Sequence, residues 1–213
     1  MGLVEDELQD VRKLCEHLII GSKLVSCVQT MVRVEIKRTS FKYIIVCIQF
    51  PAEYPSVPIL IELKSKTLSE KLLYKLTGIC EQEAKKYLGK PQILKVLKFI
   101  RTFIDENPLS CCFDEISDVR KDLNNDKDEL KLRQKNSIIS LRLHQGKYHL
   151  KTKIKVPDDY PTSSVSLEDV ETNFPPLFER HFKAQAIETA RQCVEPPLGK
   201  KTIRPIFPTS CFT

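Results

Sequence analysis

Alternating apolar and polar residues predict an antiparallel sheet in the first half of the chain. The alternation is clearest in residues 23–37, where apolar side chains are separated by charged ones. Two further runs rich in β-branched residues follow at 43–50 and 59–63, and this composition is typical of strands. A period of two places every second side chain on the same face of a sheet. We therefore expect a meander of three or four strands.

Helical periodicity precedes and follows this meander. Residues 4–19 place apolar side chains at helical spacing, with acidic residues early and basic residues later, so they predict an amphipathic helix. Thr67 and Glu70 have the spacing of a capping box, which predicts a helix over 69–88. Pro91 suits the first turn of another helix. We expect these later helices to cover one face of the sheet.

The second half of the chain repeats this order in a shorter form. Residues 137–144 and 147–156 alternate around a Gln-Gly pair and predict a hairpin, and 164–170 predict a further strand. Residues 176–194 predict one amphipathic helix. The side chains expected to face inward from that helix are Leu177, Phe178, Phe182, Ala186, Ile187 and Ala190.

Changes in composition divide the chain into four parts. Residues 110–135 are strongly charged and interrupted at Asn124-Asn125-Asp126, which predicts a bridging helix that begins the second lobe. The last nineteen residues contain four prolines and no periodicity, which is typical of a linker or flexible tail. The expected parts are a first lobe at 1–107, a charged bridging helix or linker at 108–135, a shorter second lobe at 136–195 and a proline-rich tail at 196–213.

A tyrosine-proline loop lies between two strands in each half. The first loop contains Tyr54, Pro55 and Pro58, and the second contains Tyr160 and Pro161. Proline fixes φ and donates no hydrogen bond, so such a loop leaves the sheet and stays rigid. We expect each tyrosine ring to pack across its own loop.

This order of helix, meander, Tyr-Pro loop and helix resembles the superfamily of RWD domains and ubiquitin-conjugating enzymes. Because the loop and its strands recur in the second half of the chain, the whole chain resembles a tandem RWD protein. Its layout is similar to the central double-RWD region of the Fanconi anaemia ubiquitin ligase. The resemblance implies an α+β fold of two RWD-like lobes, each an antiparallel β-meander packed against helices. It also implies a docking function, because RWD relatives without a catalytic cysteine act through protein contacts.

Cys80 is the one candidate for conjugating-enzyme chemistry. Its spacing from Pro55 resembles that between the Tyr-Pro loop and the cysteine of a conjugating enzyme, and the preceding Thr-Gly-Ile resembles the end of an active-site segment. The His-Pro-Asn tripeptide of such enzymes is absent, however, and Cys80 falls on the apolar stripe of a predicted helix. A thiol buried there would be inert. We therefore expect no catalytic residue and keep Cys80 as the alternative.

Composition narrows the possible cofactors and partners. The eight cysteines form no CxxC pair, and His17, His144, His149 and His181 lack metal-finger spacing, so we expect reduced thiols, no metal and no cofactor. The net charge of +6 is mild, and no basic stripe with stacking aromatics is evident, so nucleic acid is not an expected partner. No apolar run suits a bilayer and the start lacks a signal peptide, so we expect a cytoplasmic or nuclear location without membrane contact.

The preferred hypothesis is a non-catalytic protein-protein interaction scaffold, in which the double module docks a substrate or partner of a ubiquitin ligase. The alternatives are a ubiquitin-conjugating-type enzyme using Cys80 and a structural adaptor unrelated to ubiquitin. The chain has no RING cysteine cluster, so we expect either a fragment or isoform whose RING would follow the tail, or a stand-alone adaptor. We expect the partner surface on the second lobe and tail, at Phe174, Leu177, Phe178, Ile203, Ile206 and Phe207.

Overall fold

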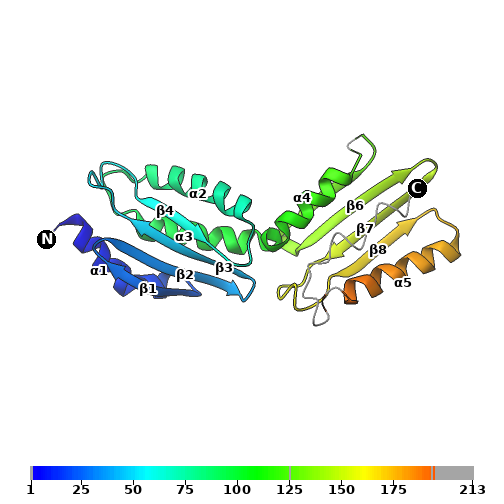
Figure 1. The fold of residues 1–213 in the computed structure, drawn as a ribbon, viewed down its shortest axis with the longest axis horizontal. Helices are drawn as coiled ribbons and strands as arrows, with labels where there is room; N and C mark the ends of the chain where they lie inside the picture. The colour runs from blue at the N-terminus through cyan, green and yellow to red at the C-terminus, as the bar shows by residue number, and fades with distance from the viewer. Residues whose placement is uncertain (1, 125, 193, 195–213) are drawn as a thin grey trace. The chain divides into compact units, whose positions relative to one another are not determined.

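The computed structural model describes residues 2–124, 126–192 and 194, and the chain forms two compact units (Figure 1). The first unit is Met1–Ser110 and the second is Cys111–Thr213. Each unit contains a four-stranded antiparallel sheet together with helices. The expected α+β class, with two lobes that each pack a β-meander on helices, is therefore confirmed.

The sheet of the first unit is a simple meander. Its strands pair in sequence order, each antiparallel to the next. Alternate side chains of the two central strands are fully buried on one face, as their period of two predicts. The strands are β1 (Ser22–Val28), β2 (Met31–Thr39), β3 (Lys42–Gln49) and β4 (Leu60–Lys64).

Helices pack on this sheet from one end of the meander to the other. The helix α3 (Ile93–Glu106) packs on the central strands β2 and β3. The helix α1 (Leu3–Leu18) packs beside β1, and α2 (Glu70–Lys85) packs beside β4. Both α1 and α2 also contact α3, so the three helices form one layer with α3 in the middle. Burial of their apolar faces is the main stabilising contribution to this unit.

The outer edge of β1 is sealed by α1. The Arg12 guanidinium donates a hydrogen bond to the carbonyl of Cys27 at 2.8 Å. The backbone N–H of Leu24 donates to the Glu16 carboxylate, also at 2.8 Å. These contacts occupy polar groups that an edge strand otherwise presents to another strand. A β-bulge between Leu24 and Ser26 further distorts this edge.

The expected capping box at the start of α2 is wrong. Ser69, not Thr67, is the N-cap residue, and the Thr67 hydroxyl lies 3.1 Å from the hydroxyl of Ser65. The Thr67 side chain is thus engaged in the turn before the helix. Pro91 also lies outside the first turn of its helix, since Gln92 is the N-cap of α3.

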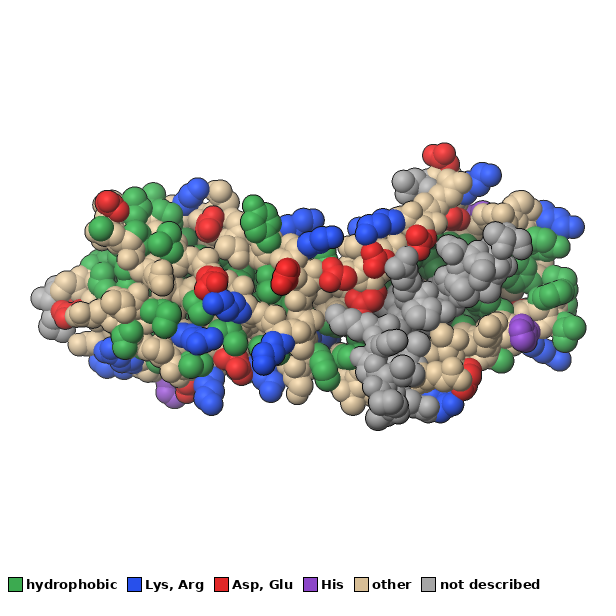
Figure 2. All heavy atoms as spheres, in the orientation of Figure 1, with side chains coloured by type: hydrophobic (Ala, Val, Ile, Leu, Met, Phe, Trp, Pro, Cys, Tyr) green, Lys and Arg blue, Asp and Glu red, His purple; other side chains and the backbone are tan. Residues whose placement is uncertain are grey.

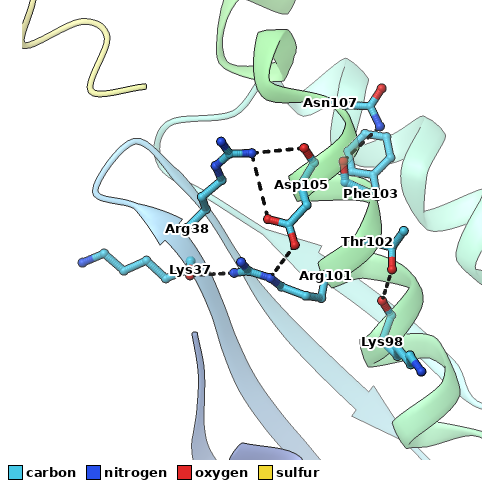
Figure 3. A network of polar contacts seen from close by, with 8 residues as sticks. All are labelled: Lys37, Arg38, Lys98, Arg101, Thr102, Phe103, Asp105 and Asn107. Atoms are coloured by element: carbon cyan, nitrogen blue, oxygen red, sulfur yellow. Dashed lines mark hydrogen bonds and ion pairs between the residues drawn. The ribbon is translucent and has the colours of Figure 1, made fainter. Parts of the chain in front are cut away.

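The end of α3 is tied to β2 by a network of polar contacts (Figure 3). Arg101 donates from Nη1 to the Lys37 carbonyl at 3.0 Å and from Nε to Asp105 Oδ2 at 2.9 Å. Arg38 donates to the Asp105 carbonyl at 3.0 Å. Asn107 donates through its side chain to the Phe103 carbonyl at 2.9 Å. Carbonyls of the last helical turn lack the usual donors further along the helix, so Arg38 and Asn107 cap it, whereas Arg101 ties it to β2.

The second unit repeats the meander with fewer described helices. Its strands again pair in sequence order. Short 3₁₀ turns at Pro108–Cys112 and Gln134–Asn136 accompany it. The elements are α4 (Phe113–Asp122), β5 (Glu129–Arg133), β6 (Ile138–Gln145), β7 (Tyr148–Lys155), β8 (Ser166–Thr172) and α5 (Pro176–Gln192).

The expected bridging segment is partly wrong, because it contributes a strand to the second sheet. The alternation of charged residues with Leu130 and Leu132 has a period of two, and these residues pair with β6 in β5. Only α4, at Phe113–Asp122, is helical in the expected way. The high charge of the segment obscured this short strand.

One constant shift in residue number relates the two units, and we call it the repeat offset. It carries Tyr54 to Tyr160 and the whole of β3 (Lys42–Gln49) onto β7 (Tyr148–Lys155). It also carries the first residues of β4 and α2 onto the first residues of β8 and α5. The two halves therefore share their element order and also their spacing. Positions in one unit can be compared directly with positions in the other.

Gly21 provides a test of the packing between α1 and β2. It has a φ of +76°, and a Cβ there would lie 2.3 Å from the Lys37 carbonyl oxygen. We expect Gly21→Ala to lower the free energy of unfolding by about 2–4 kcal/mol, through backbone strain and this collision. Urea unfolding measures the loss.

Gly89→Ala is the matched control for this prediction. Gly89 has a nearly equal φ of +75°, but a Cβ there would meet no atom within 4 Å. Its expected loss is only about 1–2 kcal/mol, from strain alone. Equal losses for the two variants would show that the collision with Lys37 contributes nothing.

Candidate functional site

Cys80 lies in the core of the first unit. It is 0 % exposed, on the buried face of α2 together with Leu76 and Ala84. Burial, with smaller contributions from the nearby carboxylates of Glu83 and Glu81, raises the pKa of this thiol to about 12. The thiolate is the nucleophilic form of cysteine. The position therefore suits a packed side chain and not an attacking group.

No arrangement typical of catalysis or metal binding surrounds this cysteine. In the ranges that the structure describes, there is no group of three or more His, Cys, Asp and Glu side chains that could hold a metal ion.

His144 and His149 lie opposite each other on β6 and β7, with ring centroids 6.5 Å apart. His144 Nδ1 lies 2.7 Å from the Lys127 carbonyl, which can only accept, so Nδ1 carries the proton. Both histidines are exposed.

The first Tyr-Pro loop is anchored by the Tyr54 side chain. Its ring meets the ring of Phe50 edge-on, with centroids 5.0 Å apart. Its hydroxyl donates a short hydrogen bond to the carboxylate of Glu7 on α1. The peptide bond between Tyr54 and Pro55 is cis. The tyrosine thus packs within its loop, as expected, and also links the loop to α1.

Glu7 joins three separate parts of the first unit. Although charged, it is only 1 % exposed. Its Oε1 accepts hydrogen bonds from the backbone N–H groups of Gln92 and Ile93, each at 2.7 Å, at the start of α3. A carboxylate is favoured there because the first N–H groups of a helix lack partners and carry partial positive charge. We call Glu7, Tyr54 and the start of α3 the Glu7 clamp.

The Glu7 clamp extends to the strand after the loop. Gln92 Oε1 accepts a hydrogen bond from the Ile59 N–H at 3.0 Å, so α3 also holds the start of β4. Burial raises the pKa of Glu7, and the hydrogen bonds from Ile93, Tyr54 and Gln92 oppose that rise. The balance of these effects sets how the clamp responds to pH.

The second Tyr-Pro loop reproduces the backbone of the first. Tyr54 N–H donates to the Pro51 carbonyl at 3.0 Å, and Tyr160 N–H donates to the Pro157 carbonyl at 3.2 Å. Ser56 and Thr162, the residues after each proline, likewise donate to carbonyls three residues earlier, each at 2.8 Å. The second Tyr-Pro bond is also cis, and Tyr160 is fully buried. The two loops are therefore the same turn, built twice.

The start of α5 exposes large apolar side chains. Leu177 is 76 % exposed and Phe178 is 65 % exposed. Phe174 is half-buried and packs on Tyr148, with ring centroids 5.5 Å apart. We call Phe174, Leu177 and Phe178 the α5 surface.

The expected inward direction of Leu177, Phe178 and Ile187 is therefore wrong, because α5 turns only its small side chains Ala186 and Ala190 fully into the core. Leu177 and Phe178 are exposed, and their role as partner-binding residues stays a prediction. Ile203, Ile206 and Phe207 lie outside the described residues.

The comparison between units shows what is unusual about Phe178. The repeat offset relates it to Leu72 of α2, which is 9 % exposed and belongs to the core. The equivalent position thus carries a large apolar side chain in both units but is buried only in the first. Large exposed apolar side chains that cluster on one surface mark sites of interaction.

The structure defines an α+β protein of two four-stranded antiparallel sheets with helices, in which Cys80 is buried. Residues 4–104, which lie in the first unit, match the RWD domain family. RWD domains are protein-interaction domains of the ubiquitin-conjugating-enzyme-like fold and are generally non-catalytic. A comparison with curated proteins found no match. In the described ranges no helix is both long and apolar enough to cross a membrane.

The burial of Cys80 leads to a test of thioester chemistry. Incubated with ubiquitin-activating enzyme, ATP and ubiquitin, the protein is expected to form no adduct that a thiol reductant removes, because the thiolate is scarce and enclosed. Non-reducing gel electrophoresis measures this, with an active conjugating enzyme as positive control. A reducible adduct that disappears in Cys80→Ser would contradict the prediction.

The Glu7 clamp leads to a test of stability. We expect Glu7→Ala to lower the free energy of unfolding by about 2–4 kcal/mol, since it leaves two buried N–H groups without their acceptor. Tyr54→Phe removes one hydroxyl and is expected to cost about 1–1.5 kcal/mol, whereas Tyr54→Ala, which removes the ring, should cost about 3–5 kcal/mol. Urea unfolding of these variants and of the double variant measures the coupling. Additive losses would show that the two side chains act independently.

The clamp should also make stability depend on pH. Because the pKa of Glu7 is raised in the folded state above its ordinary value of 4.5, the folded state binds this proton more tightly than the unfolded chain. The stabilisation that Glu7 provides is fully present at pH values below its ordinary pKa. It is lost as the pH rises through the raised pKa of the folded state. The unfolding free energy of the protein minus that of Glu7→Gln should therefore decrease as the pH rises from the ordinary to the raised pKa of Glu7. A difference that rises with pH would contradict the direction.

Proposed function

We propose that the chain is a non-catalytic tandem RWD scaffold that docks a substrate or partner for a ubiquitin ligase. The observation that carries the proposal is the exposure of Phe178 at a position that belongs to the core of the first unit. The buried Cys80 and the general lack of catalysis in RWD domains favour docking over conjugation. We further propose that the protein works in the cytoplasm or nucleus.

The repeated loop supports the tandem part of the proposal. The second unit has the element order, the spacing and the turn hydrogen bonds of the first, although the RWD match covers residues 4–104 alone. A duplicated module offers two surfaces on one chain. It can therefore hold two proteins near each other, as a substrate-docking subunit must.

The direct test uses charged substitutions in the α5 surface. We expect Leu177→Asp and Phe178→Asp to weaken capture of a RING-type ligase component and its substrate by about tenfold or more, since each places a charge in an apolar contact. Ile187→Asp is the matched control, because Ile187 is 58 % exposed on the same helix, farther along it. Purified protein, quantitative capture and ubiquitylation of the captured substrate are the measurements.

The outcomes of this test separate the alternatives. Capture of ligase components that depends on Leu177 and Phe178 supports the proposal. Partners without any ubiquitin activity, lost in the same variants, would favour an adaptor unrelated to ubiquitin. A thioester on Cys80 would favour a conjugating-type enzyme. Equal loss in the Ile187→Asp control would remove the α5 surface from the proposal.

A further inference from the structure

The segment that runs from the end of β4 into α3 carries an excess of positive charge. Between residues 64 and 101, ten Lys and Arg residues face three acidic ones. The first helix of the same unit differs, because Glu5, Asp6, Glu7, Asp10 and Glu16 make α1 predominantly acidic. Within α2 itself three lysines are balanced by Glu70, Glu81 and Glu83, so the excess lies in the segments that flank α2 and in the first part of α3. The lysines of α2 are distinguished by the face that they occupy. An acidic partner would be attracted to this side of the unit.

On the exposed face of α2, a stripe of three lysines lies near a tyrosine. Lys71, Lys75 and Lys85 follow the helical repeat and lie opposite the buried stripe that contains Leu76 and Cys80. Basic and hydrophobic side chains both appear on the surface over α2 in Figure 2. Neither Lys71 nor Lys85 has an ion-pair partner among the residues that the structure describes.

Tyr74 lies within this stripe, and its side chain is largely exposed to solvent. It is 83 % exposed, the largest exposed fraction among the exposed large apolar side chains. Tyrosine is enriched at the centres of interfaces because it combines a large contact area with a hydrogen-bonding group. Its position between Lys71 and Lys75 places that ring among positive charges. One exposed aromatic ring thus lies among the lysines of this helix.

Gly78 lies on the same stripe, one turn after Tyr74. Glycine inside a helix destabilises it relative to alanine. Apart from the helix's own backbone, a Cβ at Gly78 would meet no atom within 4 Å. Packing inside the unit therefore does not require glycine here. A missing side chain on an outer helix face does permit the backbone of a second helix to approach closely.

The equivalent face in the second unit is different in character. The repeat offset relates Lys71 to Leu177 and Tyr74 to Arg180. The outer face of α5 is thus apolar at its start, whereas that of α2 is basic. The two lobes share a fold but present different chemistry at equivalent positions.

We propose that the outer stripe of α2, formed by Lys71, Tyr74, Lys75, Gly78 and Lys85, docks an acidic amphipathic helix of a partner protein. The partner's carboxylates pair with the lysines, and its backbone approaches Gly78 beside the Tyr74 ring. Protein is favoured over nucleic acid because the stripe contains lysine without arginine and offers one aromatic ring, not a series for stacking. This surface is separate from the α5 surface and does not depend on the ligase role.

The test measures binding of the full chain to a defined acidic probe. The probe is a fluorescein-labelled amphipathic peptide of about 20 residues, with glutamate on one helical face and leucine and alanine on the other. Fluorescence anisotropy should show binding that weakens about tenfold in Lys71→Glu/Lys85→Glu and by a similar factor in Gly78→Leu. Gly78→Leu keeps the charge of the stripe and replaces glycine by a better helix former. Circular dichroism confirms that each variant is folded.

Matched controls distinguish a specific surface from general charge attraction. Lys13→Glu/Lys23→Glu makes the same change in net charge at positions on α1 and β1, and should leave binding within about twofold. Equal weakening by both pairs, absent binding, or no effect of Gly78→Leu would each overturn the proposal. Tighter binding of single-stranded RNA or of phosphatidylserine vesicles, lost in the Lys71→Glu/Lys85→Glu variant, would overturn it in favour of a nucleic acid or a membrane.

Discussion

The first unit depends on one buried carboxylate. Glu7 lies on α1, yet its oxygens meet the start of α3 and the tyrosine of the Tyr-Pro loop. Removing a charged group from water is unfavourable unless hydrogen bonds compensate for it. Here two helical N–H groups and a phenol supply those bonds. These bonds couple α1, the start of α3 and the Tyr-Pro loop. A change at any one of the three therefore alters the contacts of the other two.

In the two units, the residues that hold the fold differ from the residues on the outer faces of α2 and α5. Both units keep the meander and the turn at Tyr54 or Tyr160. The outer faces of α2 and α5 instead differ in chemistry at equivalent positions, lysine in one and leucine in the other. Turn and core positions are constrained by burial, whereas outward positions are free to vary. Such divergence is what the proposed scaffold would need in order to hold two unlike partners.

Much of the fold could be predicted from the sequence, because strands and amphipathic helices have periods that a single chain reveals. The buried site of Cys80 followed from its place on an apolar stripe. The Glu7 clamp could not be predicted, since its acceptor lies far in sequence from its donors Gln92 and Ile93. The strand β5 was missed because lysine and glutamate dominate so short a segment. The exposure of Phe178 depends on which elements pack beside α5. The hydrophobic periodicity of the sequence carries no information about that packing.

The sealing of β1 by Arg12 and Glu16 has a consequence for how this protein can aggregate. Amyloid-like growth requires each added strand to offer a fresh edge to the next. In the first sheet, side chains of α1 already occupy two of the backbone polar groups of β1. While the first unit is folded, its β1 edge is therefore a poor template for an added strand.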